Sequence, residues 1–337
     1  MSKKRVVATI GPASEGEEVL KQILPYVAIA RMNMSHGTYV EHESKIKKVR
    51  EISPDTKILI DLQGPKIRLG KFPQGPVNYR KGECTHLIYD LGNINNCDKE
   101  HLYVSIPHLI TEINIGDILL FNDGYISAKV LEKREGNRLY IEMLNNGILS
   151  SNKGINTSTA SLSIDPLTEK DLADLEFGVN QNPDYVALSF VRSGEDVKKL
   201  RDLLDNYNCP AKIIVKIERH EAIQNLDEII KLADVAMIAR GDLGVEVDIL
   251  ELPRLQKLII DVSKKYGKEC IWATQVLESM MSVPRPTRAE MTDLYSAIDL
   301  GADYTMLSAE SATGDYPFES VKLMADMWGK YGSFGNK

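Results

Sequence analysis

The chain has 337 residues, of which 43% are hydrophobic and 26% charged, values that are ordinary for a globular protein with one large domain and room for a smaller one. Its formal charge is −7, and no basic stripe appears, so we expect no nucleic acid partner. No apolar run approaches the ~18 residues of a membrane span, and the N-terminal segment is too short for a signal peptide. The four scattered cysteines form no CxxC pair, so we expect a cytoplasmic protein with no membrane partner and no zinc site.

Short apolar or β-branched segments recur along the chain and predict eight strands. They lie at residues 5–10, 27–35, 57–63, 184–190, 212–218, 235–240, 269–274 and 304–309. Near-continuous apolar strands are expected when both faces of a parallel sheet are buried. Most gaps carry an apolar stripe at helical spacing, at residues 17–27, 195–207, 221–233 and 252–267.

Eight strand–helix units predict an α/β protein with a closed (β/α)8 TIM barrel. A doubly wound open sheet is the alternative, but the even spacing and the lack of a Gly-rich fingerprint after the first strand count against it. The gap between the third and fourth strands is far too long for a strand–helix connection. Its period-two alternation and its Gly, Asn and Asp turns predict an inserted all-β lid domain between strand 3 and helix 3.

This reading divides the chain into three ranges. Residues 1–69 form the first part of the barrel, residues 70–160 the inserted lid, and residues 161–337 the second part of the barrel. The barrel resumes with a helix in "PLTEKDLADLEFGV", for which Thr168 is the predicted N-cap, with Asp171 three residues further on.

Polar residues concentrate where the predicted strands end, which is where barrel active sites are built. The set comprises Arg31, Asn33, Ser35, His36, Asp61, Lys66, Arg68, Lys216, Glu218, Arg240, Asp242, Thr274, Gln275, Ser308 and Glu310. A single residue of this kind is usually an incidental helix cap. The same pattern at six strand ends predicts a functional site.

Two carboxylates in this set predict a site for a divalent metal. Lys216 and Glu218 are two residues apart, so on a strand both project to one face, and Asp242 follows the next strand. Mg²⁺ commonly takes one or two protein carboxylates and fills its other positions with substrate oxygens and water. A plain Lys216–Glu218 salt bridge is the alternative reading of the pair.

The same strand ends offer groups that bind anions and stabilise a migrating phosphoryl group. Gly241, in "ARGDLGVE", leaves backbone amides accessible to a substrate carboxylate, and Thr274 is expected at a helix N-terminus as a cap or an anion ligand. Arginines, a lysine and Mg²⁺ around one opening are what phosphoryl transfer requires. The chain has no GxxxxGK[ST] motif, so it is not a P-loop enzyme.

The ordered motifs of the chain resemble those of the pyruvate kinase family from residue 5 to about 320. They are "TIGPAS", "ARMNMSHG", "DLQGPKIR", "NDGYIS", "KIE", "ARGDLG", "ATQVLESM", "PRPTRAE" and "GDYP". The resemblance implies a barrel with a β-rich lid that closes on phosphoenolpyruvate and ADP, giving pyruvate and ATP in the last step of glycolysis. It also implies Mg²⁺ or Mn²⁺ as the metal and ADP/ATP as the nucleotide.

The resemblance also implies a role for each matching position. Lys216 corresponds to the lysine that stabilises the transferring phosphoryl group and the enolate, and Arg31 to the phosphate-binding arginine. Glu218 and Asp242 correspond to the metal ligands, and Gly241 and Thr274, with Asp242, to substrate-binding positions. The positions matching the nucleotide side are Asn33, Ser35, His36, Arg68, Lys153 and the lid carboxylate Asp123. Ser308 and Glu310 match the region proposed to pass a proton to the enolate.

The sequence also departs from the family pattern. Only residues 318–337 follow "GDYP", so we expect no C-terminal regulatory domain and no subunit interface through it, which leaves a homodimer through the barrel. Three other functions stay open: phosphotransfer on another enol or keto acid in a specialised pathway, a metal-dependent aldolase or lyase, and a catalytically weak metabolite-sensing paralogue. An aldolase or lyase would leave the lid, Arg31 and Lys216 without a role. A sensing paralogue would bind phosphoenolpyruvate without turnover.

Lys66 predicts that the chain needs no K⁺. Family members that require K⁺ resemble one another in having a glutamate at this position, and members with lysine resemble the K⁺-independent type. An ammonium group is a tethered monovalent cation that can take the ion's place among Asn33, Ser35 and Asp61. At ~4 Å two opposite charges attract by ~4 kcal/mol at an effective dielectric constant of ~20.

Overall fold

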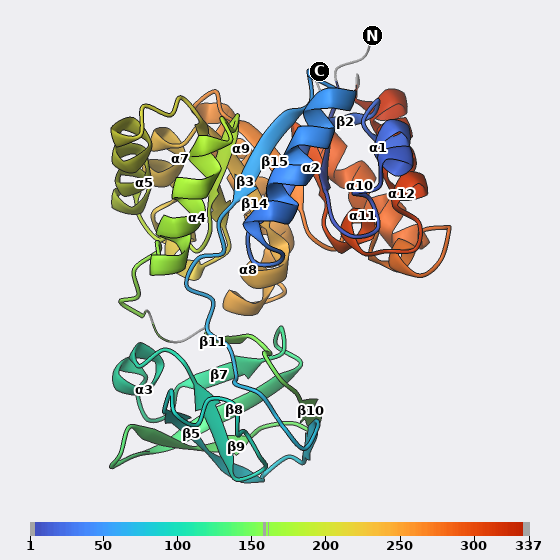
Figure 1. The fold of residues 1–337 in the computed structure, drawn as a ribbon. Coiled ribbons are helices and arrows are strands. Elements are labelled where there is room, and N and C mark those ends of the chain that lie inside the picture. The colour runs from blue at the N-terminus through green and yellow to red at the C-terminus, as the bar shows by residue number, and fades with distance from the viewer. Residues whose placement is uncertain (1–3, 158–159, 161, 333–337) are drawn as a thin grey trace. The chain divides into compact units, whose positions relative to one another are not determined.

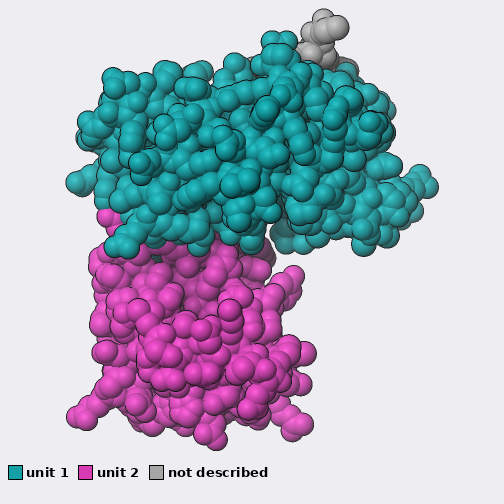
Figure 2. Space-filling view, in the orientation of Figure 1, with its two compact units in different colours: residues 1–64, 166–240, 251–337 teal, residues 65–165, 241–250 magenta. Residues whose placement is uncertain are grey.

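The computed structural model describes residues 4–157, 160 and 162–332, which form two compact units. The first unit contains residues 1–64, 166–240 and 251–337, and the second contains residues 65–165 and 241–250 (Figure 2). Residues 241–250, which the sequence reading assigned to the barrel, therefore group with the inserted segment.

The first unit is built on a closed barrel of eight parallel strands (Figure 1). In chain order the strands are β1 (Val6–Thr9), β2 (Val27–Asn33), β3 (Lys57–Asp61), β12 (Tyr185–Leu188), β13 (Lys212–Ile217), β14 (Val235–Ala239), β15 (Glu269–Ala273) and β16 (Tyr304–Leu307). Each follows its neighbour around the barrel, and β1 closes it by pairing with β16, with Val6 opposite Thr305. The predicted TIM barrel and all eight predicted strands are confirmed.

The barrel interior is filled by side chains rather than open. One cluster of buried residues takes members from every strand: Val7, Ile29, Leu59, Tyr185, Ala187, Ile214, Val235, Met237, Ile271, Ala273, Tyr304 and Met306. In β12, β14, β15 and β16 two members of this cluster stand two residues apart, as the alternation of side chains in an extended chain requires. The packed interior confines polar chemistry to the strand ends.

Helices cover the outer face of the barrel (Figure 1). They are α1 (Glu17–Ile23), α2 (Tyr39–Ile52), α4 (Glu169–Asn180), α5 (Gly194–Asn206), α6 (His220–Gln224), α7 (Leu226–Leu232), α9 (Leu252–Lys265), α10 (Arg288–Leu300), α11 (Ala309–Ala312) and α12 (Pro317–Tyr331), with a 3-10 turn η1 (Glu278–Met281). The predicted cap of α4 is confirmed, because Thr168 and Asp171 form a reciprocal capping box. The single helix predicted over 221–233 is wrong, since Asn225 separates α6 from α7.

The second unit is a β structure with its own hydrophobic core. A six-stranded sheet has the order β11 (Ile155–Thr157), β7 (Ile118–Phe121), β8 (Ile126–Arg134), β9 (Arg138–Met143), β5 (Cys84–Tyr89) and β6 (His101–Val104). A two-stranded sheet pairs β10 (Gly147–Leu149) with β4 (Val77–Tyr79), and α3 (His108–Glu112) is a short helix. Residues 241–246 of this unit belong to α8 (Arg240–Glu246), which begins directly after β14.

None of the helices in the described ranges combines the length and the apolarity that crossing a membrane would require.

Candidate active site

Arg31 and Asp61 form a buried ion pair at the ends of two adjacent barrel strands, β2 and β3. Arg31 Nε donates to Asp61 Oδ2 over 2.5 Å, and Lys216 Nζ lies 3.7 Å from Asp61 Oδ1. The Asp61 side chain is only 1% exposed. Burial acts to raise the pKa of the Asp61 carboxyl, but the charges of Lys216 and Arg31 outweigh it and hold that pKa below its usual value. Asp61 is therefore an anion that fixes two cations.

Lys216 is held by several groups at once at the end of β13. Its Nζ donates to Ser189 Oγ over 2.7 Å and lies 3.6 Å from Glu218 Oε2, on the face that the two-residue spacing predicts. Ser189 in turn donates to the carbonyl of Leu62, and Glu218 Oε1 accepts from the amide of Phe190 over 2.7 Å. These contacts fix the position of the ammonium before any substrate arrives.

The cluster as a whole joins five consecutive strands of the barrel, β13, β12, β3, β2 and β1. The last member is Thr9 on β1, whose Oγ1 accepts from Arg31 Nη1 over 2.8 Å. Two cations and two carboxylates face one another in a space that is almost closed to water. Such an arrangement holds its charges in fixed positions, so they need no reorganisation when a charged ligand binds.

The first strand and the fourth supply members that sequence reasoning missed. Thr9 orients Arg31, and Ser189 orients Lys216. A hydroxyl at a strand end carries little sequence signal, because serine and threonine are also the commonest turn and cap residues. Both residues lie at predicted strand ends, and this position is the one sequence signal that could have identified them.

Glu310 connects the ends of β15 and β16. It is 3% exposed, and its carboxylate accepts from the amides of Leu277 and Ser308, over 3.2 and 2.8 Å. Its charge is thus engaged by two backbone donors, and the predicted proton-relay role of Ser308 and Glu310 stays a prediction.

The structure corrects the expectation that Thr274 begins a helix. Thr274 has a φ of 64° and Gln275 a φ of 52°, so both are left-handed, and the following 3-10 turn has its N-cap at Leu277. Thr274 Oγ1 donates to the carbonyl of Ala273 over 2.7 Å. A β-branched residue with positive φ is a rare conformation that surrounding contacts must hold in place.

The residues expected on the nucleotide side of β2 lie at the end of that strand and in the turn after it. Asn33 Oδ1 accepts from the amide of Ser35 over 3.2 Å, and the carbonyl of His36 contacts the His42 ring at 2.8 Å. The turn precedes α2, whose N-cap Thr38 forms a capping box with Glu41. Their predicted role with the nucleotide stays a prediction.

The remaining predicted residues belong to the second unit. Lys66 Nζ donates to Asp242 Oδ1 over 2.7 Å, and Arg68 Nη1 donates to the carbonyl of Asn152 over 3.0 Å. Asp123 is exposed in a left-handed turn that ends at Gly124. Lys153 and Gly241 also belong to this unit.

The partners of Lys66 and Asp61 differ from those assigned from the sequence. Lys66 lies beyond the Gly64–Pro65 boundary, in the second unit, and pairs with Asp242. The ion pairs of Asp61 are with Arg31 and Lys216. The role of Lys66 as a replacement for K⁺ stays a prediction.

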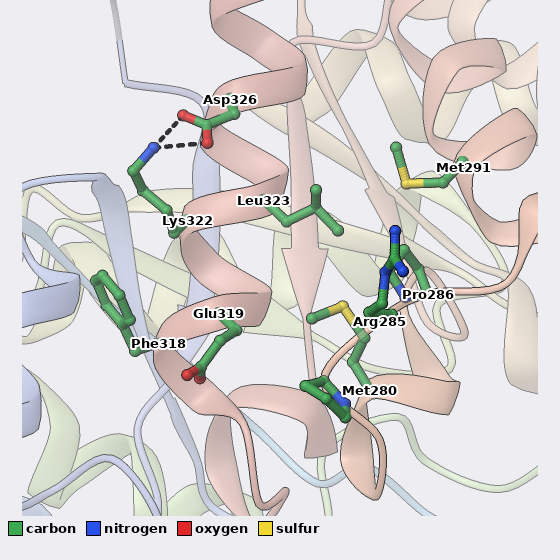
Figure 3. Close-up of a pocket in the computed structure, with 10 residues that line it drawn as sticks. Met280, Arg285, Pro286, Met291, Phe318, Glu319, Lys322, Leu323 and Asp326 are labelled. Atoms are coloured by element: carbon green, nitrogen blue, oxygen red, sulfur yellow. Dashed lines mark hydrogen bonds and ion pairs between the residues drawn. The ribbon is translucent and has the colours of Figure 1, made fainter.

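A separate cavity of about 530 Å³ lies between α12 and the segment that joins η1 to α10 (Figure 3). Met280, Met291, Phe318 and Leu323 give it an apolar lining, and Lys322 and Asp326 form an ion pair at its edge. It contains none of the predicted site residues.

An eight-stranded parallel barrel with a charge cluster at its strand ends defines the molecule as a (β/α)8 barrel protein. A model of the pyruvate kinase barrel domain matches residues 1–321, and the chain belongs to the pyruvate kinase family. It is 41% identical to a pyruvate kinase of Geobacillus stearothermophilus over 330 residues, which is 96% of this chain and 56% of that protein. It is 42% identical over 333 residues to pyruvate kinase II of Salmonella typhimurium, 96% of this chain and 69% of that protein.

Proposed function

We propose that the protein catalyses the pyruvate kinase reaction, the transfer of a phosphoryl group from phosphoenolpyruvate to ADP. The observation that carries the proposal is the cluster of Arg31, Asp61, Lys216 and Glu218, whose charges are fixed by one another and by backbone groups. Phosphoryl transfer depends on positioning and on fixed positive charge around the migrating group. Membership of the family adds support.

In this proposal Arg31 binds the phosphate and Lys216 stabilises the negative charge of the transferring group and of the enolate. Their ion pairs with Asp61 keep both side chains in one rotamer, so little conformational entropy is lost when substrate binds. Thr274, Gly241 and Asp242 contact the substrate, and Ser308 and Glu310 lie on the proton path to the enolate carbon.

The carboxylates of Glu218 and Asp242 are the residues that would hold Mg²⁺ or Mn²⁺. Carboxylate oxygens are the ligands that such hard ions prefer, so the donor set fits the metal. When bound, the divalent ion supplies positive charge to the substrate oxygens. Glu218 Oε2 lies 3.6 Å from Lys216 Nζ, so the proposed metal ligand and the proposed catalytic lysine are close together.

The nucleotide side of the proposal comprises the turn after β2 and parts of the second unit. Asn33, Ser35 and His36 would contact ADP from the barrel. Arg68, Lys153 and Asp123 would contact it from the inserted unit, with residues 70–160 acting as a lid. We also propose a cytoplasmic location and a homodimer through the barrel.

Lys66 would replace the monovalent cation on which many pyruvate kinases depend. Its ammonium is held by a carboxylate at 2.7 Å, so a positive charge is tethered beside a proposed metal ligand. A free K⁺ ion at the same place would be repelled by the ammonium.

The test is a coupled assay of pyruvate formation from phosphoenolpyruvate and ADP with excess Mg²⁺. We expect turnover that depends on all three components. A folded sample that binds phosphoenolpyruvate in calorimetry without turnover would contradict the proposal and favour a sensing role. Phosphorylation of a panel of keto acids with ATP, followed by mass spectrometry, separates pyruvate from related substrates.

A further inference from the structure

Left-handed residues other than glycine occur at nine described positions, and their identities single out one loop. Six are Asn or Asp, which tolerate this conformation: Asn122, Asp123, Asn137, Asn152, Asn182 and Asn208. The others are Phe190, Thr274 and Gln275. Thr274 is the one β-branched residue among the nine, and Gln275 follows it directly. The loop after β15 therefore holds two consecutive residues in an unfavourable conformation.

Arg240 contacts the carbonyls of this loop through two nitrogens of its guanidinium group, Nε and Nη2. Nε donates to the carbonyl of Ala273 over 3.0 Å, and Nη2 donates to the carbonyls of Thr274 and Gln275 over 2.5 and 3.3 Å. Three successive carbonyls thus converge on one cation. With Thr274 and Gln275 left-handed, all three carbonyls lie within reach of one guanidinium, so these contacts stabilise the loop in this conformation.

The guanidinium is itself held rigidly by groups outside the loop. Nη1 donates to both carboxylate oxygens of Asp293 on α10, over 2.7 and 2.8 Å, and the group lies over the Trp272 ring at 4.8 Å from its centroid. Trp272 Nε1 also donates to Asp293. Burial lowers the pKa of the Arg240 guanidinium, and the charge of Asp293 opposes that change.

The opposite side of the loop is held by an anion. Glu310 accepts from the amide of Leu277 over 3.2 Å, so the loop has a cation at its carbonyls and a carboxylate at an amide. An arginine fork with fixed direction suits several acceptors at once, whereas a lysine ammonium does not reach them all. The contacts over-determine the conformation of Thr274 and Gln275.

From this geometry we infer that Arg240 is a positioning residue, which holds the left-handed loop that presents Thr274 to the substrate. The inference rests on the proposed function, because Thr274 is a proposed substrate contact. Arg240 acts through the backbone of residues 273–275. A small misplacement of a group that orients substrate is enough to lower turnover, by as much as ~10²-fold for ~1 Å.

The first experiment compares Arg240→Lys, Gln275→Gly and the double variant in the pyruvate-forming assay. We expect Arg240→Lys to lower kcat/KM by ~10²-fold, with most of the loss in kcat. Glycine adopts the left-handed conformation without strain, so Gln275→Gly alone keeps wild-type kinetics and restores much of the loss in the double variant. A double variant no faster than Arg240→Lys would overturn the inference, as would wild-type kinetics in Arg240→Lys.

A matched control exists at the opposite ends of the strands. Arg5 lies over the Trp328 ring at 5.4 Å and pairs with Asp303 at 3.2 Å, so it repeats the Arg–Trp–Asp arrangement. Its guanidinium donates to the carbonyl of Asp303, which is not left-handed. Arg5→Lys therefore lowers the melting temperature without changing kcat. An equal loss of kcat in Arg5→Lys would mean that the effect of Arg240→Lys is general destabilisation.

Two further measurements keep the test decisive. If Arg240→Lys does not fold, Gln275→Val opposes the left-handed loop from an exposed position and is expected to lower kcat with Arg240 intact. Wild-type kcat in Gln275→Val would overturn the inference. Hydrogen exchange of the amides of residues 274–277 is expected to quicken in Arg240→Lys and to slow again in the double variant. That readout tests the loop even if the wild-type protein shows no turnover, an outcome that would refute the proposed function alone.

Discussion

Lys66 Nζ donates to Asp242 Oδ1 over 2.7 Å, so the ammonium proposed to replace K⁺ contacts a carboxylate proposed to bind the divalent metal. Both side chains are 20% exposed. The pair joins the segment that follows β3 to the segment that follows β14, within the second unit. The Lys66 ammonium and the proposed divalent metal would therefore share one carboxylate, that of Asp242.

Replacing K⁺ with tetramethylammonium is expected to leave the kcat of the wild-type protein unchanged, because Lys66 supplies the monovalent charge. In Lys66→Gln the tethered cation is lost, and turnover becomes dependent on K⁺. The measurement is the coupled assay in each salt. Lys71→Gln, an exposed lysine of the same unit, serves as the control and stays independent of K⁺. A large fall in wild-type kcat without K⁺ would refute the role of Lys66.

Lys216→Met is expected to lower kcat by ~10²–10³-fold or more, because it removes a fixed positive charge that the transferring phosphoryl group needs. Methionine keeps the length and packing of the side chain, so the barrel still folds. Lys212→Met makes the same substitution at the exposed start of the same strand and should leave kcat unchanged. A comparable kcat in both variants would show that Lys216 has another role.

Asp61→Asn is expected to destabilise the protein at pH 7 by ~3–5 kcal/mol, since it leaves two buried cations without their anion. The folded pKa of Asp61 is below its unfolded value, so its contribution is fully present above the unfolded pKa of ~3.9. It is lost as pH falls through the folded pKa.

Urea unfolding of wild type and Asp61→Asn from pH 7 to pH 3 measures this difference. The gap in the free energy of unfolding should be constant down to about pH 4 and narrow below it. The exposed Asp55→Asn is the matched control and should show a small gap at every pH. A gap that widens toward acid would contradict the assigned direction of the pKa.

Gly70→Ala is expected to destabilise the second unit by ~1–3 kcal/mol, because a Cβ at this position would lie 1.8 Å from the backbone oxygen of Ile94. Backbone cannot yield as a side chain can. Gly92→Ala is the control, since Gly92 is exposed and its Cβ would meet only the side chain of Asp90, at 3.2 Å. Thermal unfolding followed by calorimetry should show a lower transition for Gly70→Ala, and equal transitions for the two variants would contradict the assignment.

Much of the barrel could be predicted because its signals are local. Each strand is a run of apolar residues buried on both faces. A capping box such as Thr168–Asp171 involves only four consecutive residues, so it can be recognised in the sequence. The C-terminal ends of the strands were predicted one or two residues too long, as at 27–35 against Val27–Asn33, because the apolar pattern continues into buried loops. The break at Asn225 was missed, since the apolar spacing of 221–233 runs through it.

The sequence by itself determined the barrel, the inserted β unit and the strand ends where charge gathers, because hydrophobic period and turn chemistry act between near neighbours. Only the tertiary structure decided which charges meet. Asp61 faces Arg31 and Lys216, Lys66 faces Asp242, and Arg240 faces three carbonyls of the loop that holds Thr274. Those pairings depend on the order in which strands lie side by side around the barrel and on left-handed backbone at Thr274. The strand order and the left-handed backbone both depend on contacts between residues far apart in the chain, so no local sequence pattern predicts them.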